Sequence, residues 1–295
     1  MGNNNGRDSK IEVAVPSRNR VRASGPILIL AILFVVASFL TWYLTWFGRG
    51  LSDQEITKYL SDYNHPRHVQ HALLQVQERI VRGDKSAAQW YPQVVTLAEN
   101  PEPEFRLTAA WVMGADNSSE DFHNALKRLL MDAEPIVRRN AALALVRFGD
   151  ATSRPELLAI LNPFTINAPA AGVFDSSLGK GAAVSRGTLL ARIREPNDNV
   201  VAIRSPLPGT IQEIRGATGS NVNAQQPLLI IKSDDESLWE ALRGLALVGT
   251  KDDLKLLESY ANGLTGESDR IKQQAALTGK SIKSRIDSGE KPINQ

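Results

Sequence analysis

The sequence predicts an α+β multidomain chain. An apolar N-terminal helix precedes an α-solenoid of helical hairpins, and a small all-β module is inserted into the solenoid. Three observations predict this organisation. Residues 26–47 form one uncharged apolar stretch. Beyond it, apolar residues recur at helical spacing, and the segments that carry them resemble one another. Between residues 165 and 233 the pattern changes to short runs of Val, Ile and Leu separated by Gly, Pro and Asn, which is typical of strands and turns.

The composition excludes several classes of site. Of 295 residues, 34 are basic and 32 are acidic, so no overall field favours nucleic acid. The chain contains no cysteine, which excludes disulfides, thiolate nucleophiles and cysteine-based metal sites. Any chemistry must therefore come from local clusters of other side chains.

Residues 26–47 are predicted to form a transmembrane helix. Their 22 residues (47 − 26 + 1), at about 1.5 Å each, would cross roughly 30 Å of hydrocarbon. The end of the stretch carries rings that favour a membrane interface, namely Trp42, Tyr43, Trp46 and Phe47. A cleaved signal peptide is the alternative, but such peptides have apolar cores of about 7–15 residues and a small-residue cleavage site.

The charge bias around this helix predicts its orientation. Five basic residues precede it and two follow it at a similar distance: Arg7, Lys10, Arg18, Arg20 and Arg22 before, Arg49 and Lys58 after. This bias predicts a single-pass protein of the inner (plasma) membrane with a cytoplasmic N-terminus and a periplasmic C-terminal domain. Residues 1–25 are polar and basic, and we expect a disordered cytoplasmic tail there.

Residues 50–163 are predicted to form repeated helical hairpins. Aligning Pro103 with Pro135 also aligns Arg106 with Arg138, at an offset of 32 residues (135 − 103). Proline suits the first turn of a helix, where its missing N–H is not needed. Upstream, Ser52 has the spacing of a capping box with Glu55 and is expected to open the first helix.

The segment EPIVRRNAALALVRFGD, which contains Pro135 and Arg138, resembles HEAT-like repeats of the bacterial short-repeat type. The resemblance covers roughly residues 50–163 and implies a solenoid of stacked hairpins. Such solenoids present extended surfaces that bind protein partners.

A further unit resembles these hairpins after an interruption. Gly249 matches Gly149 and Leu245 matches Leu145, an offset of 100 residues, so 68 residues (100 − 32) are inserted between neighbouring repeats. We therefore interpret residues 235–286 as the resumed repeat with its cap, followed by a disordered tail over 287–295. A separate helical hairpin is the alternative.

The inserted segment, residues 165–233, is itself a duplication. Pro169 pairs with Pro206 and Gly172 with Gly209. Three further apolar pairs follow after a one-residue gap, namely Val184 with Val222, Leu190 with Leu228 and Ile193 with Ile231. Two such halves can bury their apolar faces only against each other.

The APxxG and SPxPG openings and the closing TLLARI and PLLII segments resemble the biotinyl/lipoyl-like barrel-sandwich hybrid. In carrier members of that family a modified lysine occupies the hairpin between the halves. Here that hairpin contains Arg194, Glu195, Pro196, Asn197, Asp198 and Asn199, and no lysine occurs from Gly181 to Ile231. Because biotin and lipoate need a primary amine, we expect no cofactor.

The same lysine-free hybrid occurs in membrane fusion (periplasmic adaptor) proteins of efflux and secretion systems, which also carry an N-terminal anchor. This sequence departs from them in two respects. A short polar loop replaces their coiled-coil hairpin, and helical repeats replace their further β domains.

Few residues suggest a chemical site. His65, His68 and His71 lie three residues apart, but no carboxylate close in sequence is seen to complete a metal site, so a solvated helix start is expected. No nucleophile elbow, phosphate-binding loop or HExxH motif occurs, so no catalytic residue is predicted. Arg138, Arg139 and Arg147 are expected to form an ordinary solvated surface.

These observations predict a membrane-anchored, non-enzymatic scaffold or adaptor of the bacterial cell envelope. It would contact the lipid bilayer through residues 26–47 and bind protein partners, with an efflux or secretion transporter complex as a candidate, but not nucleic acid. The alternative hypothesis is a diverged biotin/lipoyl-type carrier or cofactor-handling subunit of a membrane-linked enzyme.

Overall fold

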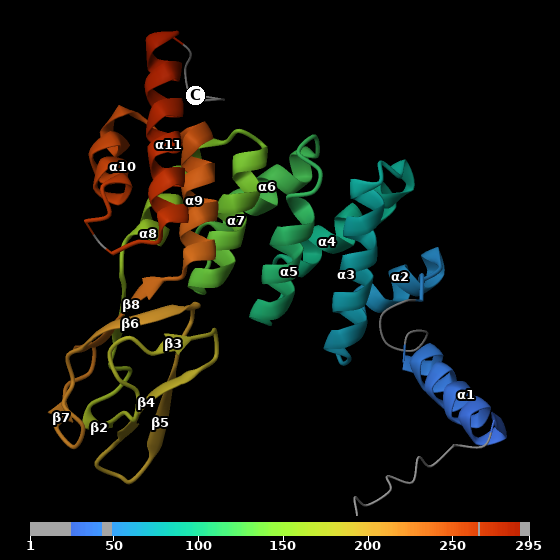
Figure 1. The fold of residues 1–295 in the computed structure, drawn as a ribbon, viewed down its shortest axis with the longest axis horizontal. Helices are drawn as coiled ribbons and strands as arrows, with labels where there is room; N and C mark the ends of the chain where they lie inside the picture. Colours follow the sequence, from blue (N-terminus) through green and yellow to red (C-terminus); the bar gives the residue numbers. More distant parts are fainter. Residues whose placement is uncertain (1–24, 43–48, 265, 290–295) are drawn as a thin grey trace, which may run out of the picture. The chain divides into compact units, whose positions relative to one another are not determined.

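The computed structural model describes residues 25–42, 49–264 and 266–289 (Figure 1). The chain divides into two compact units, Met1–Gly50 and Leu51–Gln295, and each is described by itself. In the first unit the described residues form one helix, α1 (Gly25–Trp42).

The prediction of a transmembrane helix over residues 26–47 is wrong. Within the described residues, no helix is both long enough and apolar enough to cross a membrane. The predicted single-pass location in the inner membrane is therefore corrected. Of the predicted interface residues, Trp42 is the last described residue of α1, whereas Tyr43, Trp46 and Phe47 lie outside the described residues. Of the basic tail predicted over residues 1–25, residues 1–24 also lie outside them, and Gly25 is the first residue of α1.

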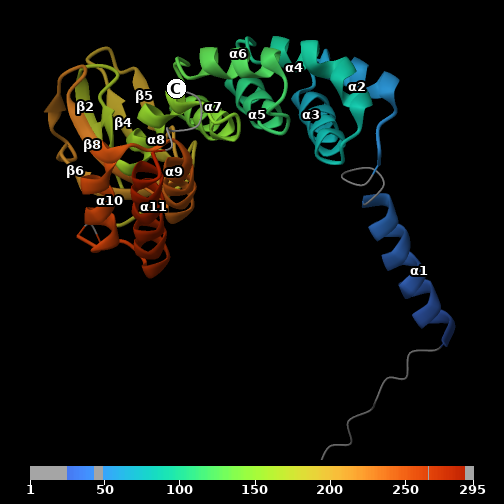
Figure 2. The same cartoon turned by 90° about the horizontal axis from the view of Figure 1, so that it is seen from above.

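The second unit contains a row of helical hairpins and an antiparallel β module. Its helices are α2 (Asp53–Leu60), α3 (Pro66–Val81), α4 (Tyr91–Leu97), α5 (Pro103–Met113), α6 (Glu120–Leu129), α7 (Pro135–Arg147), α8 (Arg154–Leu161), α9 (Asp235–Val248), α10 (Leu254–Ala261) and α11 (Asp269–Asp287). Figure 2 shows the row as an arc, with α4 and α6 along its outer side and α3, α5 and α7 along its inner side.

The helix starts follow the sequence signals. Ser52 accepts a hydrogen bond from the backbone N–H of Glu55, whose side chain in turn accepts one from Ser52, so the predicted capping box is present. Pro103 and Pro135 each occupy the first turn of a helix. The prediction of helical hairpins that begin at these prolines is confirmed.

The 32-residue period is also visible in the hydrogen bonds. Arg106 Nη1 donates to the carbonyls of Asn100 and Pro101, at 2.9 Å each. Arg138 Nη1 donates to the carbonyls at the two corresponding positions, 32 residues further on (138 − 106), at 2.8 and 3.1 Å. Each arginine thus fixes the turn before its own helix in the same way, because the repeated sequence places the same donor and acceptors together.

Successive hairpins are joined by a series of polar contacts that we call the rungs. In each rung, a residue at the start of a second helix contacts an aspartate in the inter-helix turn of the following hairpin. The pairs are Tyr91 Oη with Asp116 Oδ2, His123 Nε2 with Asp150 Oδ2, and Arg154 Nη2 with Asp253 Oδ1, each at 2.6 Å. The third rung joins residues that are separated in sequence by the whole β module.

The hydrophobic core runs along the row in two neighbouring clusters. One extends from α2 to α7, with Trp90, Phe105 and Phe122 among its largest buried side chains. The other joins α7 and α8 to α9, α10 and α11. The α9–α10 hairpin therefore packs directly against the hairpin that precedes the β module, and α11 covers it.

The β module consists of two four-stranded antiparallel sheets with strand orders β1-β8-β6-β3 and β5-β4-β2-β7. The strands are β1 (Phe164–Asn167), β2 (Gly172–Asp175), β3 (Ala183–Val184), β4 (Leu189–Arg194), β5 (Val200–Arg204), β6 (Gly209–Ile214), β7 (Asn221–Val222) and β8 (Pro227–Ser233). Each strand of the first half has a counterpart four places later in the second half, so that β1 corresponds to β5 and β4 to β8. Replacing every strand by its counterpart converts the strand order of one sheet into that of the other. The predicted duplication is therefore present as an internal two-fold relation.

Two matched glycines show how closely the halves correspond. A Cβ atom on Gly172 would lie 2.3 Å from the carbonyl oxygen of Arg194, and one on Gly209 would lie 2.2 Å from that of Lys232. These distances are far below van der Waals contact, so only glycine fits at either position. The sequence paired these two glycines, and the structure gives the reason for the pairing.

The module leaves and rejoins the helices at one place. β1 pairs with β8, with Phe164 opposite Ile231, so its entering and leaving strands lie side by side. Ser233 Oγ donates to the carbonyl of Ile160 at the end of α8 and accepts from Arg139 Nη2 on α7 at 3.3 Å. The expectation that Arg139 is solvated is wrong, since only 5% of it is exposed beneath the inserted module.

Candidate functional site

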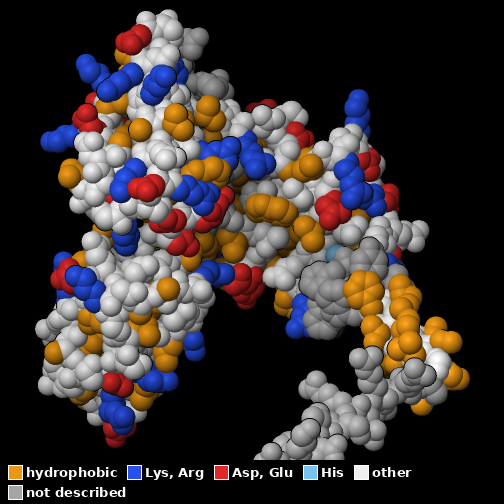
Figure 3. All heavy atoms as spheres, viewed as in Figure 1, with side chains coloured by type: hydrophobic (Ala, Val, Ile, Leu, Met, Phe, Trp, Pro, Cys, Tyr) orange, Lys and Arg blue, Asp and Glu red, His pale blue; other side chains and the backbone are white. Residues whose placement is uncertain are grey.

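The inner side of the arc carries a hollow that crosses three helices. Its volume is about 230 Å³. It is lined by Trp111, Gly114, Asn140, Leu143, Ala144, Arg147 and Glu240, which come from α5 and its C-terminal end, α7 and α9. Figure 3 shows hydrophobic side chains gathered in the hollowed middle of this face, over α5 and between α5 and α7.

Close packing of α5 and α7 forms the floor of the hollow. A Cβ atom on Gly114 would lie 2.9 Å from the Cβ of Ala144, so the two small residues allow the helices to approach. Arg147 Nη1 donates to the carbonyl of Gly114 at 3.2 Å, and Asn117 Nδ2 donates to the carbonyl of Arg147 at 2.9 Å. These hydrogen bonds hold the polar edge of the hollow in place. Trp111 lies beside this edge, and 45% of its surface is exposed.

The α9 side of the hollow is charged. Partial burial and the neighbouring carboxylate of Glu236 raise the pKa of Glu240 above its ordinary value, against the opposing effect of Arg243 and Arg147. In the neighbouring residue, Trp239, the ring contacts two guanidinium groups, with Arg243 at 4.6 Å and Arg270 at 4.5 Å from its centroid. Cation–π contacts of this kind hold the aromatic ring and both arginines in place.

The size and lining of the hollow indicate what it can accept. Small-molecule and cofactor sites usually have volumes of about 300–1,000 Å³, which exceeds the 230 Å³ here. The hollow instead combines an exposed tryptophan, Trp111, with an arginine, Arg147, and these are the residue types enriched among the residues that dominate protein–protein interfaces. The hollow is therefore smaller than a usual small-molecule site and is comparable in size to a single large side chain.

The hairpin between the two β halves has the position that the sequence predicted for it. It joins β4 to β5, with Glu195 N–H donating to the carbonyl of Asn199 and Asp198 N–H donating to that of Glu195. Asp198 adopts a left-handed conformation with φ of 62° to close the turn. The turn contains Pro196 and Asn197 but no lysine, and Arg194 belongs to the end of β4, so no amine lies at the tip.

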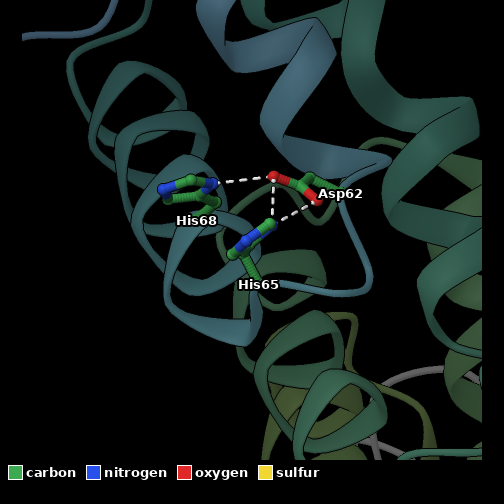
Figure 4. A group of neighbouring side chains, drawn as sticks. All are labelled: Asp62, His65 and His68. Atoms are coloured by element: carbon green, nitrogen blue, oxygen red, sulfur yellow. Dashed lines mark hydrogen bonds and ion pairs between the residues drawn. The ribbon is translucent and has the colours of Figure 1, made fainter.

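The predicted histidine candidates separate into a pair and a third residue. Asp62, three residues before His65, brings His65 and His68 together, as Figure 4 shows. His65 Nδ1 lies 2.9 Å from Asp62 Oδ1, and His68 Nδ1 lies 2.7 Å from Asp62 Oδ2. The expectation that no carboxylate stands near these histidines is therefore wrong. The residues between α2 and α3 form a tight turn, and its folding, rather than helical spacing, sets these distances.

The same cluster has a clear electrostatic signature. Hydrogen bonds from His65 and then His68 hold the pKa of Asp62 below its ordinary value. His68 also stacks on the Tyr59 ring, with centroids 4.2 Å apart. His71 lies one turn further along α3 and outside the cluster, and its Nε2 is buried with no hydrogen-bond partner among the described residues.

Comparison with known proteins identifies part of the helical region. The HEAT repeats family matches residues 91–164, so the helical hairpins of this region are HEAT-like repeats, and the β module follows them. The search of the curated proteins found no match.

One solved structure with a similar region is that of a single-chain, multi-domain long-chain acyl-CoA carboxylase. The identity is 15%, the TM-score is 0.23, and the match covers 49% of this chain and 13% of the carboxylase chain. At this score the similarity carries no argument about function.

Proposed function

We propose that this protein is a non-enzymatic scaffold that binds a protein partner through the inner side of its HEAT-like repeats. The observation that carries the proposal is the hollow beside Trp111, where an exposed aromatic ring lies over a small socket flanked by Arg147 and Glu240. Extended inner surfaces are what stacked helical repeats offer to partners. The sequence contributes no nucleophile or phosphate-binding motif that would suggest catalysis.

We further propose that the β module is a biotinyl/lipoyl-like barrel-sandwich hybrid that has lost its carrier function. Two observations support this assignment. The strand orders of its two sheets are related by exchange of the halves, and the hairpin at the expected modification site has no lysine. Such a module can present a surface to a partner but cannot carry a group on an amide-linked arm.

The scaffold proposal is tested by capturing partners with the full chain and then measuring their affinity for purified variants. Trp111→Ala should weaken binding by about tenfold or more, because truncation of a central aromatic anchor typically costs more than about 1–2 kcal/mol. The matched control is Met131→Ala, since Met131 is 85% exposed and lies in the turn between α6 and α7. This control should leave the affinity unchanged.

A photo-crosslinking residue placed at position 140 or 131 provides a second measurement that leaves Trp111 in place, since Asn140 also lines the hollow. The captured partner should cross-link through position 140 and not through position 131. The proposal fails if the partner binds the Trp111→Ala variant as tightly as it binds the wild type. An efflux or secretion transporter is one candidate partner, suggested by the adaptor resemblance, and its recovery in this capture would specify the process.

The carrier alternative makes a separate prediction about covalent mass. A diverged carrier would show a prosthetic group as an added mass on the intact chain isolated from its source. We expect the mass of the bare polypeptide. A stable addition mapped to residues 194–199 would replace the scaffold proposal with the carrier hypothesis.

A further inference from the structure

We propose that Asp62, His65 and His68 form a binding site for a divalent transition-metal ion such as Zn²⁺. Each residue offers one ligand atom, and these atoms all lie within 4.8 Å of one another. Two imidazole nitrogens and one carboxylate oxygen are ligands that Zn²⁺ accepts, with water at the remaining position. Among the described residues, no other group of three such donors comes together.

The separations between these atoms suit a single ion. Donors bound to tetrahedral Zn²⁺ at about 2.0–2.1 Å lie about 3.3 Å from each other. Here His65 Nδ1 and His68 Nδ1 lie 2.9 and 2.7 Å from the nearest oxygens of Asp62. Small side-chain rotations would therefore admit the ion without movement of the backbone.

The local fold holds the three donors before any ion arrives. Asp62 lies in the turn after α2, and its carbonyl accepts a hydrogen bond from the backbone N–H of His65, which immediately precedes α3. His68 is fixed by its stacking on Tyr59 of α2. Because two donors come from the turn after α2 and the third comes from α3, a bound ion would clamp this turn against α3 at the start of the solenoid.

The surroundings leave room for the ion and its water ligands. The side chains of His65, His68 and Asp62 are 64%, 42% and 23% exposed. An ion can therefore reach the cluster from solvent. Transition metals favour imidazole and thiolate ligands. The whole chain has four histidines and no cysteine, and two of these four histidines come together in this cluster.

The competing explanation is that the cluster is only a hydrogen-bonded pair of histidines around an aspartate. His123 and Asp150 provide a natural comparison, because they form a similar contact of 2.6 Å with one histidine instead of two. A metal site needs the second imidazole, whereas a simple hydrogen-bonded pair does not. The number of histidines around the carboxylate is therefore the property to test.

The test is a calorimetric titration of the metal-free full chain with ZnCl₂, together with thermal unfolding with and without the ion. We expect one equivalent to bind with a dissociation constant in the micromolar range. The Tm should rise by several degrees at a hundredfold excess of Zn²⁺ over that constant, because an ion that binds only the folded state stabilises it.

Three variants make the assignment specific. His68→Gln and Asp62→Asn should each weaken Zn²⁺ binding by more than about tenfold, because each removes a direct ligand. His123→Gln should leave binding unchanged. The proposal is overturned if the wild type binds no Zn²⁺ at micromolar concentrations, or if His68→Gln binds as the wild type does. Equal loss in His123→Gln would indicate an effect on the fold and would also count against the site.

Discussion

The helical row and the β module both arise from duplicated sequence, but they use the copies differently. In the helices each copy contacts its neighbours, through a shared core and through rungs such as His123 with Asp150. In the β module the two halves are interleaved, since each sheet contains strands from both. A row of this kind can be extended or interrupted, whereas the module exists only when both halves are present.

This difference explains how one domain can lie inside the other. The module enters and leaves through the paired strands β1 and β8, so it occupies little of the surface between successive hairpins. The Arg154–Asp253 rung forms across the insertion with the same 2.6 Å distance as the earlier rungs. We therefore expect damage to the helices to stay local and damage to the module to spread through both halves.

The largest effect should come from a single methyl group in the β module. Gly209→Ala would place a Cβ atom 2.2 Å from the carbonyl oxygen of Lys232, a backbone atom that cannot rotate away. We expect a loss of about 3 kcal/mol or more in the free energy of unfolding, at the upper end for overpacking. Hydrogen exchange should accelerate in strands of both halves, while α2 to α5 keep their protection.

Gly179→Ala is the matched control for this substitution. No atom lies within 4 Å of the position where its Cβ would be, so the change should alter stability by less than about 1 kcal/mol. If hydrogen exchange in the first half of the module became slower or stayed unchanged in Gly209→Ala, the description of the two halves as interleaved would be incorrect.

A smaller and local effect is expected for Asp132→Asn in the helices. Asp132 accepts hydrogen bonds from Arg106 Nε and Nη2 at 2.6 and 2.9 Å and from the backbone N–H of Glu134. Only 6% of its side chain is exposed. Loss of this charge beside a partly buried guanidinium should cost about 2 kcal/mol at neutral pH. The faster hydrogen exchange should be confined to α5, α6 and α7.

The same residue predicts a dependence on pH. Burial alone would raise the pKa of Asp132, but hydrogen bonds from Arg106 and Glu134 outweigh it and hold the pKa below its ordinary value. Its contribution to stability is therefore complete above the ordinary range near pH 4 and is lost as the pH falls through the lowered value. Denaturant unfolding from pH 6 to pH 2 should show a shallower acid decline for Asp132→Asn than for the wild type.

Glu78→Gln provides the control for both measurements. Glu78 pairs with Arg82 at 3.4 Å on the surface, where the two side chains are 42% and 75% exposed. Such pairs contribute little, so we expect a change of less than about 0.5 kcal/mol. An effect as large as that of Asp132→Asn would show that the loss does not depend on burial.

The duplicated patterns could be predicted from the sequence because they depend on local rules. Pro103 and Pro135 mark helix starts, and Ser52 with Glu55 forms a capping box wherever it opens a helix. The pairing of Gly172 with Gly209 followed from aligning the halves. None of these inferences required knowledge of which segments pack together.

The contacts that build the sites could not be predicted in the same way. Burial of Arg139 depends on where the inserted module rests, and Trp111 stays exposed beside a hollow that residues of three helices line. Asp62 lies three residues before His65 in the sequence, but only the fold of the turn before α3 shows that it contacts both His65 and His68. The membrane prediction rested on the length of an apolar stretch, whereas within the described residues no helix is both long enough and apolar enough to cross a membrane.

The smallest effect should appear where the two β halves differ in one turn. Gly187 adopts φ of 83°, whereas Gln225, at the matching place in the second half, holds φ of 66° without glycine. Gly187→Gln should cost about 1 kcal/mol, because no atom crowds its Cβ position and only the left-handed conformation is unfavourable. The reverse change, Gln225→Gly, should alter stability by less than about 0.5 kcal/mol. Glycine removes the cost of the left-handed conformation, but its greater conformational freedom in the unfolded chain offsets this gain. Denaturant midpoints that moved equally in both variants would mean that the halves do not share this turn geometry.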